Sequence, residues 1–245
     1  MNVSDENEIK KEFQLERLIF FSDAVFAIII TIMILDVKLP EQLIHPSEEE
    51  SKQAFINILP KVVAYCVSFS IIGSFWVRHL KIFSFLKDYN PQLLVLNLLF
   101  LFSVSLFPFA LSFAFSSSNV MQYTWGFYIY MGIIYLALLT QTLLMHYLIR
   151  NKEVLCLKAH DIEKEFKWKV RRMSYAMIPF FLIVITIVGN TRLTLYIVFG
   201  GMVIYGILVS RLKKKWYPNV KDDSVTLFSF FKKAKIEQHS QKRVN

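Results

Sequence analysis

Six long runs of apolar residues restrict this chain to one class of fold. About 20 apolar residues cross a bilayer as a helix, because lipid offers the backbone no hydrogen-bond partners and a helix satisfies its own. The chain of 245 residues is 55% hydrophobic, which is too apolar for an ordinary soluble domain. We therefore predict an all-α membrane protein with six transmembrane helices. The runs cover approximately residues 18–37, 55–77, 92–115, 123–149, 173–190 and 193–210.

The basic residues predict the orientation of these helices. With a cytoplasmic N-terminus, 24 of the 28 Lys and Arg residues lie on the cytoplasmic side, as the positive-inside rule requires. We expect a multi-pass protein with both termini in the cytoplasm. Its expected parts are a head (1–17), a six-helix domain (18–210) with a cytoplasmic linker near 150–172, and a basic tail (211–245).

The basic tail has two possible partners. It contains ten basic and three acidic residues, and such a patch is compatible with nucleic-acid binding. A basic stretch directly after a membrane helix more often fixes orientation and contacts anionic lipid. We therefore expect membrane lipid, and no nucleic acid, as the partner of this segment.

The arrangements that intramembrane enzymes require are absent from the sequence. It contains no HExxH, no GxSxG and no paired catalytic aspartates, and its five histidines are scattered. The carbonyl filter sequence TVGYG of common potassium channels is missing too. We expect neither an enzyme nor a cofactor site, which leaves ion permeation, transport or a structural role.

Residues 17–35, which make up most of the first apolar run, contain a single carboxylate, Asp23. A charged side chain at membrane depth is costly unless it is paired or hydrated, so Asp23 is a candidate functional residue. At about 100° per residue, Ile28, Ile32 and Leu35 form one stripe of the helix, and Asp23 falls about 140° away from it. If the stripe faces a pore, Asp23 points back into the helix bundle.

Two polar residues of the same leaflet are candidate partners for Asp23. His79 ends the second apolar run and Asn97 lies near the start of the third. An imidazole and an amide would satisfy a buried carboxylate. Alternatively, His79 is an interfacial residue and Asn97 a general hydrogen bonder between helices. The residues alone leave both interpretations open. Pro108 and Pro179 are expected to kink the third and fifth helices.

The motif RxxxFSD, formed by Arg17, Phe21, Ser22 and Asp23, resembles the signature of the endolysosomal potassium channel family known as transmembrane protein 175. The run FSDAVFAIIITIMIL is similar to the pore helix of that family. FWVRHLKIF is similar to its second helix, and LNLLFLFSVSLFPF to its third. The resemblance extends to about residue 115.

This resemblance implies a bacterial, single-repeat subunit that assembles as a homotetramer in the inner membrane, with the first helix lining a four-fold pore. Permeating potassium is the only metal ion that it implies. The residues carried over are a pore constriction of Ile28, Ile32 and Leu35, a hydroxyl layer at Thr31, and a supporting network of Arg17, Phe21, Ser22, Asp23, Trp76, His79 and Asn97.

The expected function is a potassium-preferring cation leak channel with a hydrophobic constriction. The acidic residues Glu41 and 48–50 of the outer loop would concentrate cations near its mouth. One alternative is a proton-coupled secondary transporter or proton pathway that uses Asp23 and His79, although transporters commonly show broken helices at mid-membrane. A second alternative is a membrane scaffold that conducts nothing.

Overall fold

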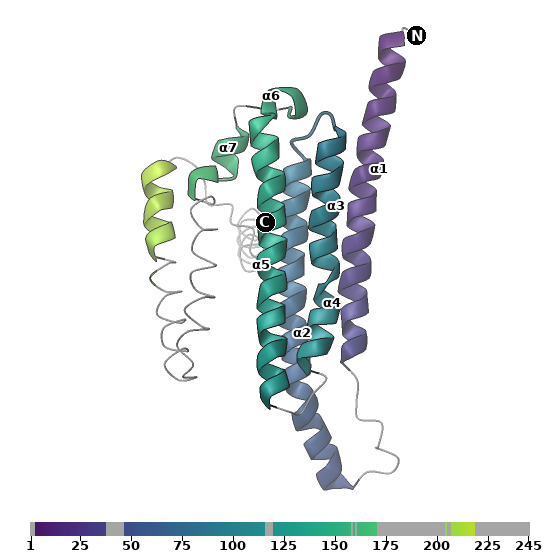
Figure 1. Ribbon diagram of the computed structural model, residues 1–245, viewed down its shortest axis with the longest axis vertical. Coiled ribbons are helices and arrows are strands. Elements are labelled where there is room, and N and C mark those ends of the chain that lie inside the picture. The colour runs from purple at the N-terminus through teal and green to yellow at the C-terminus, as the bar shows by residue number, and fades with distance from the viewer. Residues whose placement is uncertain are drawn as a thin grey trace, which may run out of the picture. The chain divides into compact units, whose positions relative to one another are not determined.

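The computed structural model of the chain describes residues 3–37, 47–115, 120–157, 159, 161–170, 204 and 207–218. These residues are mostly helical (Figure 1). The predicted fifth helix, most of the sixth, the tail beyond residue 218, Glu41 and Pro179 lie outside them. The elements are α1 (Val3–Ile32), η1 (Met33–Asp36), α2 (Glu48–Phe83), α3 (Pro91–Ser105), α4 (Phe107–Phe115), α5 (Val120–Arg150), α6 (Lys152–Leu155) and α7 (Ile162–Glu165).

Four helical stretches of the described chain are long and apolar enough to span a membrane. They coincide with the first four predicted spans, which agrees with an all-α membrane protein. Their bounds are Ile9–Leu35, Glu48–Phe83, Pro91–Phe113 and Tyr128–Arg150.

Helix α1 is longer than the apolar run that predicted it. It starts at Val3, inside the predicted head, and continues without a break to Ile32. A helix of 30 residues is about 45 Å long, which exceeds the roughly 30 Å hydrocarbon core of a bilayer. The polar first half of α1 therefore projects beyond the membrane as an extension of the same rod.

Helix α2 also extends beyond its apolar run. Ser47 and Glu50 form a capping box, in which the Ser47 backbone N–H donates to Glu50 Oε2 at 2.8 Å and the Glu50 N–H donates to Ser47 Oγ at 3.3 Å. This cap starts the helix before the membrane. Pro60 lies inside α2 and cannot donate to the preceding turn, which explains why the first turns lean away from the rest of the helix in Figure 1.

The third predicted span consists of two helices, α3 and α4. Asn90 caps α3, its side chain accepting from the Leu93 N–H at 2.9 Å, and Pro91 takes the first helical position. The break comes at Leu106, two residues before Pro108, whose missing N–H interrupts the helical hydrogen bonds. The predicted kink at Pro108 is confirmed.

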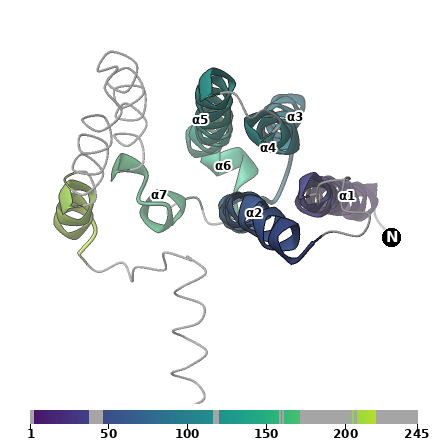
Figure 2. The same ribbon diagram turned by 90° about the horizontal axis from the view of Figure 1, so that it is seen from below.

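One compact unit includes residues 1–144. Its core lies between α1, α2, α3, α4 and the first part of α5. Helix α1 contacts α2, α3 and α4 and lies at one edge of this group (Figure 2). The core consists of Phe26, Ile29, Met33, Ile72, Phe75, Phe100, Leu101, Val104, Phe107, Ala110, Leu111, Ile133 and Ala137.

A second compact unit covers residues 145–222. Within it, the ring of Trp168 stacks on His146 of α5, with centroids 5.7 Å apart. Lys152 Nζ forms an ion pair with Glu163 Oε1 at 2.9 Å, which joins α6 to α7. These contacts give local structure to the linker that the sequence predicts to be cytoplasmic.

Candidate pore face and its supporting hydrogen bonds

Helix α1 has one packed face and one open face. The packed face points into the core with Leu15, Ser22, Phe26 and Ile29, and it continues into η1 with Met33. The predicted pore stripe lies on the other face, where Ile28 is 56% and Ile32 46% exposed, and it continues into η1 with Leu35, which is 63% exposed. Among the described residues of this single subunit, nothing covers this stripe of large apolar side chains.

Thr31 lies on the same open face and is exposed. Its hydroxyl donates to the carbonyls of Ala27 at 2.9 Å and Ile28 at 3.0 Å, the usual back-bonding of threonine in a helix. Because the proton is used within the helix, the oxygen presents its lone pairs outward. An array of such oxygens can contact a cation.

Arg17 and Phe21, the first two residues of the RxxxFSD motif, also lie on the open face. Phe21 is 50% exposed. Among the described residues, Arg17 makes no hydrogen bond or ion pair. The single subunit therefore does not bring these two residues together with the other predicted members of the supporting network.

A chain of hydrogen bonds links α2, α3 and α1. His79 Nε2 bonds Asn97 Oδ1 at 2.8 Å, Asn97 Nδ2 donates to Ser22 Oγ at 3.0 Å, and Ser22 Oγ donates to the Leu18 carbonyl at 2.9 Å. Since Asn97 Oδ1 can only accept, this amide orientation makes Nε2 of His79 the protonated nitrogen. Each of the three side chains then donates one hydrogen bond.

This chain is sealed from the surroundings by aromatic rings. Ser22 and Asn97 have no exposed surface, and His79 is 1% exposed. The imidazole stacks on Phe83 at 4.1 Å and on Phe100 at 5.5 Å between ring centroids. Leaving one buried polar group without its partner costs about 1–3 kcal/mol, so the chain fixes how α1 sits against α2 and α3.

Asp23 has a different partner from the one that the sequence suggests. Its Oδ1 accepts from Nε1 of Trp76 at 2.9 Å, rather than from His79 or Asn97. Trp76 lies three residues before His79 on the same side of α2. The observed donor is therefore about one turn closer to the start of that helix. The candidate pairing of Asp23 with His79 and Asn97 is not observed, and Asp23 contacts α2 through Trp76, another residue of the expected supporting network.

The N-terminal half of α1 carries contacts that sequence reasoning missed. Lys11 Nζ pairs with Asp88 Oδ2 at 3.0 Å, and the hydroxyl of Tyr89 donates to Gln14 Oε1. Both partners belong to the turn between α2 and α3. The sequence feature that could have predicted this ion pair is the opposite charge of Lys11 and Asp88, because both residues are predicted to lie on the same side of the membrane.

The outer acidic residues lie in the first turn of α2. Glu50 belongs to the capping box, and the backbone and side-chain hydrogen bonds from Ser47 lower the pKa of its carboxyl. Glu48 pairs with Lys52 at 3.2 Å, and Glu49 is exposed. Two of these three carboxylates thus have local structural roles.

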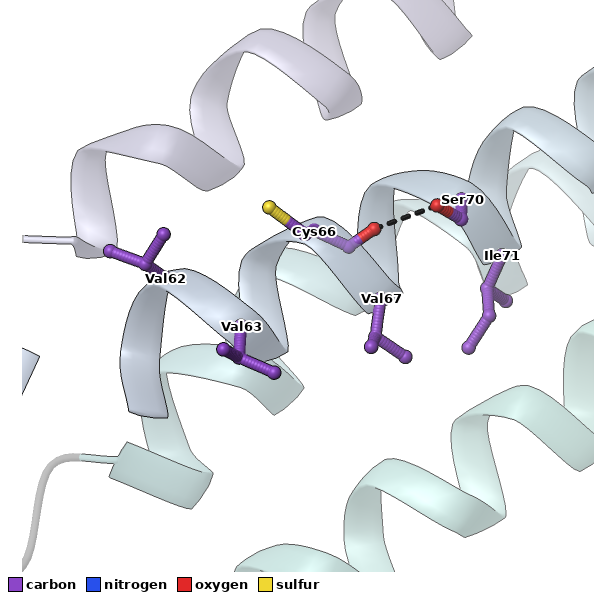
Figure 3. Close-up of a pocket in the computed structure, with 6 residues that line it drawn as sticks. All are labelled: Val62, Val63, Cys66, Val67, Ser70 and Ile71. Carbon is purple, nitrogen blue, oxygen red and sulfur yellow. Dashed lines mark hydrogen bonds between the residues drawn. The ribbon is translucent and has the colours of Figure 1, made fainter. Parts of the chain in front are cut away.

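A shallow hollow on α2 does not form a ligand site. Its lining comes from one helix face, Val62 to Ile71, and is almost wholly apolar (Figure 3). The hydroxyl of Ser70 donates to the Cys66 carbonyl at 2.8 Å. Such a surface suits contact with lipid chains. Over the described part of the chain, no cluster of three His, Cys, Asp or Glu residues is arranged to hold a metal ion.

Comparison with known proteins finds similarity in the same region. Residues 17–108 match the sequence profile of the family described as endosomal/lysosomal potassium channel TMEM175. A protein named as a potassium channel from Chryseobacterium sp. (strain P1-3) is 43% identical over 94 residues, which are 38% of this chain and 45% of that protein. The chicken protein named endosomal/lysosomal proton channel TMEM175 is 30% identical over 96 residues, 39% of this chain and 19% of that protein.

The matched segment thus spans less than half the length of these relatives. The fold likeness extends further. The crystal structure of a lysosomal potassium-selective channel TMEM175 homologue from Chamaesiphon minutus superposes with a TM-score of 0.56 at 21% identity, covering 80% of this chain and 98% of that one. The match over residues 17–108 includes every residue of the predicted pore face and of the supporting hydrogen bonds.

Proposed function

Because residues 17–108 match the sequence profile of the endosomal/lysosomal potassium channel TMEM175 family, we propose that this chain is one subunit of a potassium-preferring cation channel. Four copies surround an axis in a bacterial inner membrane, with both termini in the cytoplasm and α1 nearest the axis. The relatives named as potassium channels support the choice of ion.

The observation that carries this proposal is the open face of α1. In the subunit, Ile28, Ile32 and Leu35 are uncovered, although the opposite face of the same helix is completely packed. Four such faces around an axis form successive rings of apolar side chains. These rings are the proposed constriction, and the hydrogen bonds to α2 and α3 set the rotation of α1 that aims them at the axis.

Permeation through such rings follows from their polarity and width. An apolar constriction opposes ions by dewetting and by partial loss of hydration water. Potassium has a lower charge density than sodium and loses water more readily, so the barrier is lower for potassium. The outward lone pairs of Thr31 compensate part of the lost hydration between the Ile28 and Ile32 rings. The resulting selectivity is modest.

A proton pathway through Asp23 and His79 is the competing function, and the name of the animal relatives gives it some support. The geometry of the two residues gives this function less support. His79 is enclosed by Phe83 and Phe100 and bonds Asn97, whereas Asp23 bonds Trp76. A proton relay between the two residues would have to break both of these bonds.

Ion flux into and out of proteoliposomes tests the proposal. Vesicles loaded with potassium chloride and diluted into a medium free of potassium and sodium should acidify on addition of a proton carrier, because potassium efflux leaves an inward driving force for protons. Vesicles loaded with sodium should respond more slowly. Protein-free vesicles prepared in parallel give the background leak.

Two outcomes would contradict the proposal. Acidification before the proton carrier is added means that the protein itself moves protons, either as a conductor or in exchange for potassium. A response no faster than that of protein-free vesicles, from protein that elutes as a single folded species, supports the scaffold interpretation.

A further inference from the structure

Two basic segments that are distant in the sequence meet in the unit formed by residues 145–222. The backbone N–H of Lys169 donates to the hydroxyl of Tyr217 at 3.3 Å. This bond places the turn after α7 beside the end of the helix over 207–216. The basic residues of the two segments are Lys164, Lys167, Lys169, Arg211, Lys213, Lys214 and Lys215.

The segment that carries Lys169 is held in place by its neighbours. Trp168 is 8% exposed and stacks on His146 of α5, with ring planes inclined by 24°. Lys167, between α7 and this segment, adopts a left-handed conformation with φ of 47°. Residues 168–170 are helical, and the Val170 N–H bonds the Lys167 carbonyl at 3.0 Å. Lys169 is therefore exposed on a structured segment.

Three exposed lysines give this surface its positive charge. Lys169, Lys214 and Lys215 are exposed, and their ammonium groups make no ion pair within the described residues. The nearby carboxylate of Glu163 is bound to Lys152, and that hydrogen bond raises the pKa of the Lys152 ammonium. Glu163 is thus occupied and does not neutralise the neighbouring lysines.

The surface also carries aromatic residues suited to a membrane interface. Trp216 is 37% exposed and Tyr217 is partly exposed, directly after Lys213–Lys215. Tryptophan and tyrosine are enriched at the level of lipid headgroups. The helix over 207–216 continues the predicted sixth span, which puts these residues at the predicted cytoplasmic membrane surface. A nucleic acid could contact these lysines, but aromatic rings at headgroup depth would not contribute to its binding.

We propose that the surface formed by Lys169, Lys214, Lys215 and Trp216 binds the phosphate headgroup of an anionic phospholipid in the cytoplasmic leaflet. Lysines supply the charge, and the indole anchors the helix end at headgroup depth. This binding does not depend on ion permeation, so it can be tested independently of the proposed channel function.

Lipid binding to the purified full chain tests the proposal. In a neutral detergent, phosphatidylglycerol and phosphatidylcholine are titrated separately, and native mass spectrometry gives the number of bound lipids. Phosphatidylglycerol should bind more tightly, and the double variant K214Q/K215Q should weaken its binding about tenfold. The control K52Q/K61Q removes the same charge on the predicted outer side and should leave the affinity unchanged. Raising the salt concentration should weaken binding to the wild type.

Three results would overturn the proposal. The first is equal affinity for the two lipids. The second is an equal loss in both double variants, with unchanged thermal stability. The third is tighter binding of a short DNA duplex than of phosphatidylglycerol, which would assign the surface to nucleic acid.

Discussion

Ile28 and Ile29 are consecutive residues with the same side chain and opposite surroundings. Ile28 is 56% exposed on the open face of α1, whereas Ile29 is 5% exposed in the core. The identical substitution at the two positions therefore separates a role in permeation from a role in packing.

We expect Ile28→Asn to leave the subunit folded, to raise single-channel conductance and to reduce the preference for potassium over sodium, because an amide ring holds water where an isoleucine ring expels it. Ile29→Asn should instead lower stability by about 3 kcal/mol, because it buries an unpaired amide and leaves a void. Bilayer recordings and thermal melting of both variants measure the difference. Unchanged permeation in a folded Ile28→Asn protein would remove Ile28 from the pore.

Single residues also show where sequence reasoning ends. The angular position of Asp23 correctly excluded it from the stripe of Ile28, because helical periodicity fixes faces within one helix. The same periodicity says nothing about the axial offset between two helices. A shift of three residues, about 4.5 Å, decides whether Asp23 meets Trp76 or His79. The observed partner therefore required the structure.

At the scale of elements, α1 is tied to the turn between α2 and α3 by Lys11–Asp88 and Gln14–Tyr89. Burial raises the pKa of the Asp88 carboxyl, but the hydrogen bonds from Lys11 and the Tyr89 backbone and the charges of Lys11 and Lys87 together lower it. Because its pKa is lowered in the folded state, the ionised carboxylate stabilises the fold at pH values above its ordinary pKa of 3.8. The contribution is lost as the pH falls through the folded-state pKa.

Asp88→Asn should therefore loosen the N-terminal half of α1 at neutral pH. The pair is exposed, so it contributes at most about 1 kcal/mol, and amide hydrogen exchange over residues 9–16 should become about two- to fivefold faster. The variant Glu48→Gln breaks the similar pair with Lys52 in α2 and should leave exchange in α1 unchanged. Equal exchange in the wild type and Asp88→Asn at pH 7 would show that this ion pair does not restrain the helix.

Element boundaries were less predictable than element faces. Apolar runs located the first four membrane helices, but α1 and α2 continue through polar residues that hydropathy assigns to a head and a loop. Capping by Ser47 and Glu50, rather than hydrophobicity, sets the start of α2. Pro108 predicted the break between α3 and α4. Pro60 bends α2 at a position where the apolar pattern predicted no bend.

At the scale of the whole molecule, the proposed tetramer brings four copies of the open face of α1 together. In a background without Cys66 and Cys156, Leu35→Cys should be joined into dimers by a short bis-maleimide, because Leu35 is 63% exposed on that face. Met33→Cys, with no exposed surface, should not react. Light scattering of the protein–detergent complex should give four times the subunit mass of 28.8 kDa. Equal cross-linking at both positions, or a monomeric mass, would contradict the assembly.

The open face of α1 also determines how such an assembly responds to dilution. Lipid chains are as apolar as isoleucine and phenylalanine, so a lone subunit is not penalised for turning this face toward lipid. Association then gains only the closer packing of side chains and helices. By mass action, the fraction of subunits that form pores depends on the number of subunits per lipid molecule and falls steeply as lipid is added. The abundance of the protein in its membrane would itself set the leak.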